Sequence, residues 1–292
     1  MTIRLKHDHG TLEAIELFQL QHHLAIPHLQ KYLQSKGSKQ CKSIKKISVD
    51  HSHLNDKDYI ALHDILKLSS KVNEISFYAN HIDTDCISYL FDSLSSDELN
   101  TIKLIDNWIG DKISPDFFSF LNNKKLAVLD LSLNWLRDIG IQRLLDALDT
   151  NMELNELVLS CNDFGLEGMK TLRHFVSQHS SLNILDISYN NLNERCAEEI
   201  AVMITESPSL THLNVRSNKI GDAGAELIAQ SLKSNNNLKY VDLSDNNISA
   251  TGLSQLVREA ETHDNLEDLI LKHNHLPPSA LKTSRSSLQV VY

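Results

Sequence analysis

The sequence repeats itself with a period that leaves little choice of fold. Nine consecutive segments, spaced 27 or 28 residues apart, begin at Ile44, Val72, Leu99, Leu126, Leu154, Leu182, Leu210, Leu238 and Leu266. Apolar residues occupy positions 1, 4, 6 and 11 of all nine segments. Asparagine occupies position 9 of eight of them, with Ser52 the exception. A unit of this length cannot bury its apolar face alone, so successive units have to stack into one array.

The first part of each segment predicts a short strand. Positions 4 and 6 are two residues apart, so both side chains point to one side of a strand and into the core. The asparagine at position 9 can bond backbone groups of adjacent turns through its amide. The eight asparagines from Asn80 to Asn274 are therefore predicted to form a structural ladder and not a binding site.

The second part of each segment predicts a helix. Apolar residues recur at positions 16, 19 and 23, which is the spacing of the buried face of an amphipathic helix. Position 15 is usually small, as in Gly224 and Gly252, which suggests close approach of the helix to the strand. Cys86 and Cys196 share this position and are predicted to be compact space-fillers.

One segment, "LTHLNVRSNKIGDAGAELIAQSLKSNNN" (210–237), carries the pattern most clearly. It resembles the ribonuclease-inhibitor-like class of leucine-rich repeats, and the resemblance extends over residues 44–280. The resemblance implies an α/β fold: an open solenoid, or horseshoe, of nine strand–turn–helix repeats with a parallel sheet on its concave face. It does not fix the function, because the class includes inhibitors, sensor domains, GTPase activators and bacterial effectors.

The two ends are expected to cap this array, because an open solenoid would otherwise expose its core. Residues 1–43 are predicted to be a helical N-terminal cap, with two short helices within residues 11–36 that Pro27 separates. Residues 281–292 are predicted to be a C-terminal cap or tail, where the chain either adds a short helix and a closing strand or remains partly disordered.

Composition excludes several classes of partner. The net charge of −10 argues against nucleic acid and against an anionic membrane surface, since neutralising phosphates needs clustered Lys and Arg. No apolar run approaches 18 residues, so no membrane insertion is expected. The first residues do not resemble a secretory signal, and the four cysteines have no CxxC spacing. A cytoplasmic protein with free thiols is expected.

The sequence also lacks the common catalytic motifs: there is no G-x-S-x-G, no phosphate-binding P-loop and no H-E-x-x-H. We therefore predict a protein that is not an enzyme and needs no cofactor. Two H-x-H stretches occur in the first and ninth repeats, too far apart to share a metal ion. One corner, formed by His51, His53 and His81, stays open as a metal site or a pH-sensitive patch.

The candidate partner-binding residues lie on the strands and in the loops that follow them. Trp108 and Trp135 both occupy position 10, in adjacent repeats, and tryptophan is enriched at binding hot spots. The alternative is that both rings fold down onto Pro115 and its helix. Arg216 stands beside Asp186 and Asp242 and either pairs with them or faces a partner. The complete candidate set is Tyr78, Ile105, Trp108, Leu133, Trp135, Tyr189, Arg216 and Tyr240.

The predicted function is a monomeric protein–protein interaction module that binds through its concave face and loop edge. Abundant Lys, Asn, Ile and Ser with few Gly and Pro indicate an AT-rich genome. Joined to a repeat of eukaryotic type, this favours an effector that a bacterial pathogen translocates into a host cell to act on a host protein. The alternative is a regulator of enzyme activity, either an inhibitor or a GTPase activator with Arg137 or Arg216 as its loop arginine.

Overall fold

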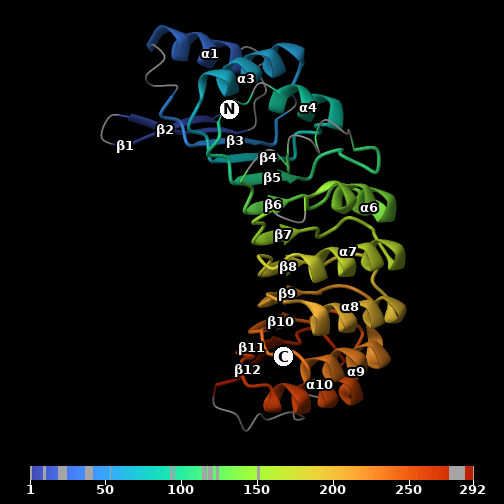
Figure 1. Cartoon of the computed structure of the whole chain (residues 1–292). Coiled ribbons are helices and arrows are strands. Elements are labelled where there is room, and N and C mark those ends of the chain that lie inside the picture. Colours follow the sequence, from blue (N-terminus) through green and yellow to red (C-terminus); the bar gives the residue numbers. More distant parts are fainter. Residues whose placement is uncertain are drawn as a thin grey trace. The chain divides into compact units, whose positions relative to one another are not determined.

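The computed structural model describes residues 2–8, 11–18, 25–36, 42–52, 54–92, 94, 96–113, 117, 121–122, 125–149, 152–275 and 287–291. The chain divides into two compact units. The first contains Met1–Asn134 and Ala147–Leu154, and the second contains Trp135–Asp146 and Asn155–Tyr292. Each unit is a stretch of the same alternation of strand and helix (Figure 1).

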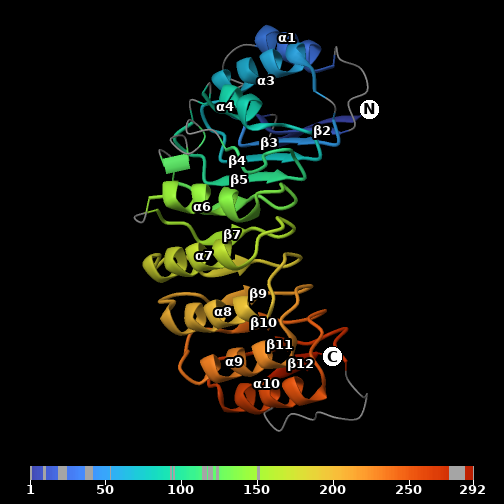
Figure 2. The ribbon, with the colours of Figure 1, turned by 90° about the vertical axis from the view of Figure 1, so that its right-hand side faces the viewer.

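In the first unit, strands β1 to β6 form a sheet in chain order. All neighbours are parallel except the antiparallel pair β1 and β2. Helices α1, α3 and α4 cover one side of this sheet (Figure 2). The elements are β1 (Thr2–Asp8), β2 (Thr11–Phe18), α1 (Ala25–Lys36), β3 (Lys46–Asp50), α3 (Asp56–Leu68), β4 (Glu74–Tyr78), α4 (Thr84–Asp92), β5 (Thr101–Ile105) and β6 (Val128–Asp130).

In the second unit, strands β7 to β12 also form a sheet in chain order. Each strand is parallel to the next. The elements are α6 (Arg137–Ala147), β7 (Glu156–Val158), α7 (Leu166–Gln178), β8 (Ile184–Asp186), α8 (Glu194–Glu206), β9 (His212–Asn214), α9 (Gly221–Leu232), β10 (Tyr240–Asp242), α10 (Ala250–Thr262), β11 (Asp268–Ile270) and β12 (Gln289–Val291). The predicted α/β repeat with a parallel sheet is confirmed.

The core follows from the register of the strands. Position 4 of one strand lies beside position 4 of the next, so Leu157, Leu185 and Leu213 form one continuous apolar row. All three side chains are fully buried, as are the position-6 residues Leu159 and Ile187. The apolar stripe of each helix packs on this layer from the other side, as Leu172 and Ile200 show. Every repeat therefore completes the core of its neighbour.

The asparagine ladder is confirmed. The Asn218 Nδ2 group donates to the carbonyl oxygens of Ile187 and Val215 at 3.1 and 2.9 Å. Its Oδ1 accepts from the backbone N–H groups of Asn190 and Leu192, both at 3.1 Å. One side chain thus satisfies backbone groups of two successive turns inside the protein, where water cannot. Asn80, Asn107, Asn134, Asn190, Asn246 and Asn274 make corresponding bonds.

The small residue at position 15 lies where two successive helices meet, and not between a helix and a strand as expected. A Cβ added at Gly224 in α9 would stand 2.8 Å from the Cβ of Ala197 in α8. A Cβ added at Gly252 in α10 would stand 3.2 Å from the Cβ of Ala225 in α9. Cys196, which holds this position in α8, is fully buried.

The predicted N-terminal cap of two helices is wrong in its first half. Residues 11–18 form strand β2, which pairs with β3 so that Ile15 lies beside Ile47 and Leu17 beside Val49. The reason is that Leu12, Ile15 and Leu17 stand at positions 1, 4 and 6 of a further, degenerate repeat unit. All three are buried. The second helix exists as α1, with Pro27 in its first turn, where a missing N–H costs no hydrogen bond.

At the other end the predicted closing strand is present as β12, parallel to β11. The short helix expected before it falls on residues 276–286, outside the described residues. No helix of the described part combines the length and apolar character that crossing a bilayer requires.

Candidate functional site

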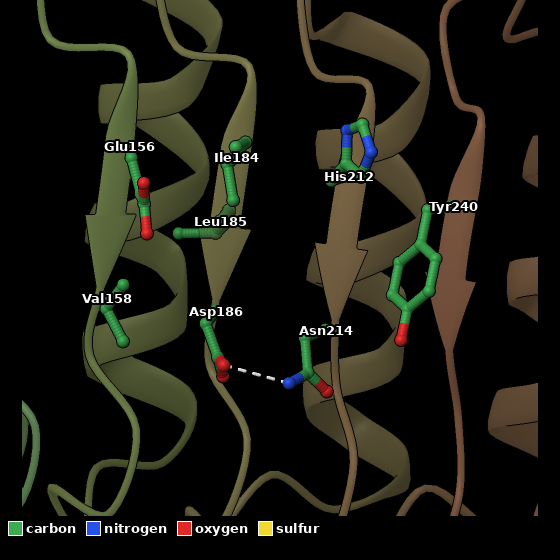
Figure 3. A pocket seen from close by; sticks show the side chains of 8 residues that line it. All are labelled: Glu156, Val158, Ile184, Leu185, Asp186, His212, Asn214 and Tyr240. Atoms are coloured by element: carbon green, nitrogen blue, oxygen red, sulfur yellow. Dashed lines mark hydrogen bonds between the residues drawn. The ribbon is translucent and has the colours of Figure 1, made fainter. Parts of the chain in front are cut away.

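The sheet has a face that the helices leave uncovered, here called the open face. On a strand, successive side chains point to opposite faces, so positions 3 and 5 project from the open face while positions 4 and 6 enter the core. On β7 to β10 this face is hollowed by a pocket of about 180 Å³. Its lining residues are Glu156, Val158, Ile184, Leu185, Asp186, His212, Asn214 and Tyr240 (Figure 3).

The carboxylate of Asp186 holds the middle of the pocket in place. Its Oδ1 accepts from the backbone N–H and the hydroxyl of Ser188 at 2.9 and 2.6 Å. Its Oδ2 accepts from the Asn214 Nδ2 group on the next strand at 2.8 Å (Figure 3). Because three donors fix both oxygens, the polar centre of the pocket is preorganised by residues of β8 and β9.

One wall of the pocket is aromatic. The rings of His212 and Tyr240 stack with their centroids 5.8 Å apart and their planes 21° apart. Burial raises the pKa of the Tyr240 hydroxyl, and the carboxylates of Asp242 and Asp268 raise it further. The pocket therefore combines an aromatic wall, apolar Val158 and Ile184, and a negative electrostatic potential.

The sequence predicted only part of this pocket. Of its residues, only Tyr240 is among the predicted candidates, whereas Glu156, Ile184 and His212, which also occupy position 3 of their repeats, are not. The signal was present: position 3 of the fifth to eighth repeats reads Glu, Ile, His, Tyr. In parallel strands of equal register these side chains have to be neighbours.

The loops directly after the strands carry a second group of candidates, here called the loop edge: Trp108 and Leu133 in the first unit and Trp135 and Tyr189 in the second. Trp108 is 64% exposed and Trp135 is 62% exposed. Leu133, Trp135 and Tyr189 have φ near +60°, in the left-handed region that turns the chain sharply after the strand. Both tryptophans are thus exposed, and the alternative of rings folded onto Pro115 and its helix stays open. Pro115 lies outside the described residues.

A family model and two solved structures resemble this chain. The model of the family described as "Leucine Rich repeat" matches residues 122–145, 150–172, 206–229 and 234–257. The chain has a leucine-rich-repeat fold. Two solved structures resemble it, a chain in the crystal structure of the Rad7 and Elc1 complex in yeast and a protein from Bacteroides fragilis. The first has 16% identity and a TM-score of 0.55 and covers 89% of this chain and 70% of that chain. The second has 16% identity and a TM-score of 0.53 and covers 91% and 74%.

These identities are low enough that the likeness concerns the fold alone. No curated protein matches the chain by sequence. What this leucine-rich-repeat chain binds therefore has to be argued from its own surfaces.

The predicted partner-binding residues are divided between the two units. Tyr78, Ile105, Trp108 and Leu133 belong to the first unit, and Trp135, Tyr189, Arg216 and Tyr240 to the second. The contact expected between the two indoles stays a prediction. Within the first unit, His81 lies against Trp108 and His51 against Tyr78, with ring centroids 4.6 Å apart in both pairs. Ile105 and Tyr78 are half-buried on the open face.

Arg216 does not pair with Asp186 or Asp242 as expected. Its Nε donates to Asp245 Oδ2 at 3.0 Å, and its guanidinium lies 5.8 Å from the centre of the Tyr189 ring. The reason is the repeat itself: an aspartate at position 5 turns back onto the serine at position 7, as Asp186 does with Ser188. The side chain of Arg216 therefore pairs with Asp245, at position 8 of the next repeat.

The histidine corner is only partly described, because His53 lies outside the described residues. The other two rings are in contact with aromatic neighbours, His51 with Tyr78 and His81 with Trp108. Within the described part of the chain, no three histidine, cysteine or carboxylate side chains are grouped as metal ligands. The metal question at this corner stays open.

The described cysteines Cys86, Cys161 and Cys196 are free thiols. Burial and the Asp83 carboxylate raise the pKa of Cys86 to about 11, and burial raises the pKa of Cys161 and Cys196. A raised pKa favours the neutral thiol, which is the unreactive form.

We therefore predict that iodoacetamide at pH 8 alkylates Cys86 about a hundredfold more slowly in the folded protein than in urea, because the pKa is about two units above that of an unperturbed thiol. Cys196, which is fully buried, is expected to react more slowly still. Peptide mapping by mass spectrometry over a time course gives both rates. Equal rates in folded and unfolded protein would contradict the assigned environments.

Proposed function

We propose that this leucine-rich-repeat protein binds a protein partner through its open face and loop edge. The observation that carries the proposal is the exposure of Trp108 and Trp135, at 64% and 62%. Large aromatic side chains held in solvent favour association, since removing apolar surface from water contributes about 25 cal/mol per Å². Tryptophan is also among the residues most enriched at the centres of protein interfaces.

The backbone beside each indole is held firmly, which supports a binding role. The Trp108 N–H donates to the Ile82 carbonyl at 3.0 Å, and the preceding Asn107 is part of the ladder. After Trp135, the N–H groups of Leu136 and Arg137 donate to Asn162. A surface that is already ordered loses little conformational entropy when it binds.

Precedent also favours an interaction module, because one of the solved structures of like fold is itself a complex, that of Rad7 and Elc1. The alternative of an enzyme regulator that uses Arg216 as its loop arginine finds less support. The Arg216 guanidinium is engaged by Asp245 and lies over Tyr189.

The proposal predicts that Trp108→Ala and Trp135→Ala each weaken partner binding about tenfold, a cost typical of truncating an interface aromatic. The measurement is affinity purification from cell lysate with quantitative mass spectrometry, followed by titration of the recovered partner. Val202→Ala is the matched control, because Val202 is also an exposed apolar residue but lies on helix α8. A partner that is retained by both tryptophan variants, or lost equally with Val202→Ala, would refute the proposed surface.

We further propose that the repeats are of the ribonuclease-inhibitor-like class and that the protein acts as a monomeric bacterial effector on a host protein in the host cytoplasm. The support is the 27- or 28-residue period and the composition rich in Lys, Asn, Ile and Ser. A fusion to a reporter enzyme that is active only in host cytosol tests the origin. Reporter signal in infected cells is expected, and signal no higher than that of a secretion-deficient strain would refute translocation.

A further inference from the structure

At positions 3 and 5 of the repeats the open face of β7 to β11 is acidic, and its long cations, Arg216 and Lys272, stand at position 7. Its residues at positions 3 and 5 are Glu156, Val158, Ile184, Asp186, His212, Asn214, Tyr240, Asp242, Asp268 and Ile270. Four of these ten described residues are carboxylates, and none is lysine or arginine. Two of the four carboxylates, Glu156 and Asp186, line the pocket. A partner group of positive charge would therefore complement this face.

The first unit shows how a cation is used at the same place in the repeat. Glu74, at position 3 of the second repeat, accepts a hydrogen bond from the Nζ of Lys46, at position 3 of the first repeat, at 2.8 Å. Glu156 is the position-3 residue of the fifth repeat, and its neighbour on the following strand β8 is the apolar Ile184. Among the described residues, no hydrogen bond or ion pair engages the half-buried Glu156 carboxylate.

We propose that the pocket on β7 to β10 binds an arginine side chain of the protein partner, with Glu156 as the main acceptor of its guanidinium. Val158 and Ile184 offer apolar surface to the methylene stem. Asp186 adds a second negative charge, already fixed by Ser188 and Asn214. The stacked rings of His212 and Tyr240 offer an aromatic surface for the guanidinium plane.

The shape and chemistry favour arginine over other occupants. Small-molecule and cofactor sites have volumes of roughly 300–1,000 Å³, whereas this pocket has about 180 Å³, room for one long side chain. Arginine stacks on aromatic faces and presents a planar fork that matches carboxylates, whereas lysine is a strongly hydrated point charge. The rings of His212 and Tyr240 beside the carboxylates of Glu156 and Asp186 therefore favour the planar guanidinium of arginine.

This inference rests on the proposed function, since it names the chemistry of the partner. The test uses the full chain and the peptide acetyl-Ser-Gly-Arg-Gly-Ser-amide, titrated by NMR with His212 and Tyr240 as reporters. Matched peptides carry citrulline, which keeps the shape without the charge, or lysine. The variants are Glu156→Gln and, as control, Glu198→Gln, an equal change of charge at an exposed position of helix α8.

The arginine peptide is expected to give saturable shifts at both reporters. The citrulline peptide is expected to bind at least tenfold more weakly, and the lysine peptide about threefold more weakly. Glu156→Gln should weaken arginine binding about tenfold, while Glu198→Gln should leave it unchanged. The inference falls if no saturable shift occurs, if citrulline or lysine binds as tightly as arginine, or if Glu156→Gln has no effect. In that case a partner that depends on Trp108 and Trp135 would still uphold the proposed function.

Discussion

Replacing Asn218 by alanine is expected to lower the free energy of unfolding by about 3 kcal/mol. The substitution removes the bonds that Asn218 donates to the carbonyls of Ile187 and Val215, and each of these carbonyls keeps one other donor, the amide of Asn190 or of Asn246. It also removes the acceptor of the backbone N–H groups of Asn190 and Leu192, which both donate to the Asn218 Oδ1. Each buried polar group left unpaired costs about 1–3 kcal/mol, and alanine offers no replacement.

Urea denaturation followed by circular dichroism measures this loss. Asn236→Ala is the matched control, because Asn236 is an exposed asparagine of the same repeat and is expected to change stability by less than about 0.5 kcal/mol. Hydrogen exchange gives a local reading, since the amides of Asn190 and Leu192 should exchange faster in the variant. A loss no greater than that of the control would show that the ladder does not support the fold.

Replacing Gly224 by alanine is expected to destabilise the protein by about 2 kcal/mol. In an ordinary helix the same change stabilises by about 1 kcal/mol, because alanine restricts the unfolded chain and favours the helix. Here the added Cβ would stand 2.7 Å from Ile220 Cγ2 and 2.8 Å from Ala197 Cβ. The Ala197 Cβ cannot move without its helix, and both neighbours are fully buried. Steric overlap therefore outweighs the gain in helix propensity.

The sign of the effect is the test. Thermal unfolding of Gly224→Ala should show a lower midpoint than the wild type. Gln230→Ala, at an exposed position of the same helix, controls for helix propensity and should leave the midpoint nearly unchanged. A raised midpoint for Gly224→Ala would mean that α8 and α9 are not packed as closely as described.

Much of the fold could be predicted because the same residue types recur at the same positions. The asparagine ladder is readable since only a side-chain amide both donates to and accepts from adjacent backbone turns. The buried polar residue after each helix is not readable in this way. Asn235 Oδ1 accepts from the N–H groups of Asn237 and Leu238, and His263 Nδ1 accepts from those of Asn265 and Leu266. An amide in one repeat and an imidazole in another accept the same pair of backbone N–H groups, so no single residue type recurs at this position of the sequence.

Strand β2 was missed for a related reason. Its L-x-x-I-x-L pattern begins at Leu12, which is 32 residues before Ile44 and not 28, and position 9 of this unit is Leu20 instead of asparagine. The open-face pocket was missed because it depends on which side chains meet across strands. The pairing of Asp186 with Asn214, and of Arg216 with Asp245, is decided by hydrogen bonding within each repeat. The position of a residue within the 28-residue repeat does not predict which of its neighbours becomes its hydrogen-bond partner.

Site-specific photo-crosslinking tests the central claim of a partner on the open face and loop edge most directly. The photoreactive residue p-benzoylphenylalanine would replace Tyr189, 50% exposed on the loop edge, or Val202, 38% exposed on helix α8. We expect a covalent adduct with the partner from position 189 and none from position 202. Adducts from position 202, or equal yields from both, would contradict it.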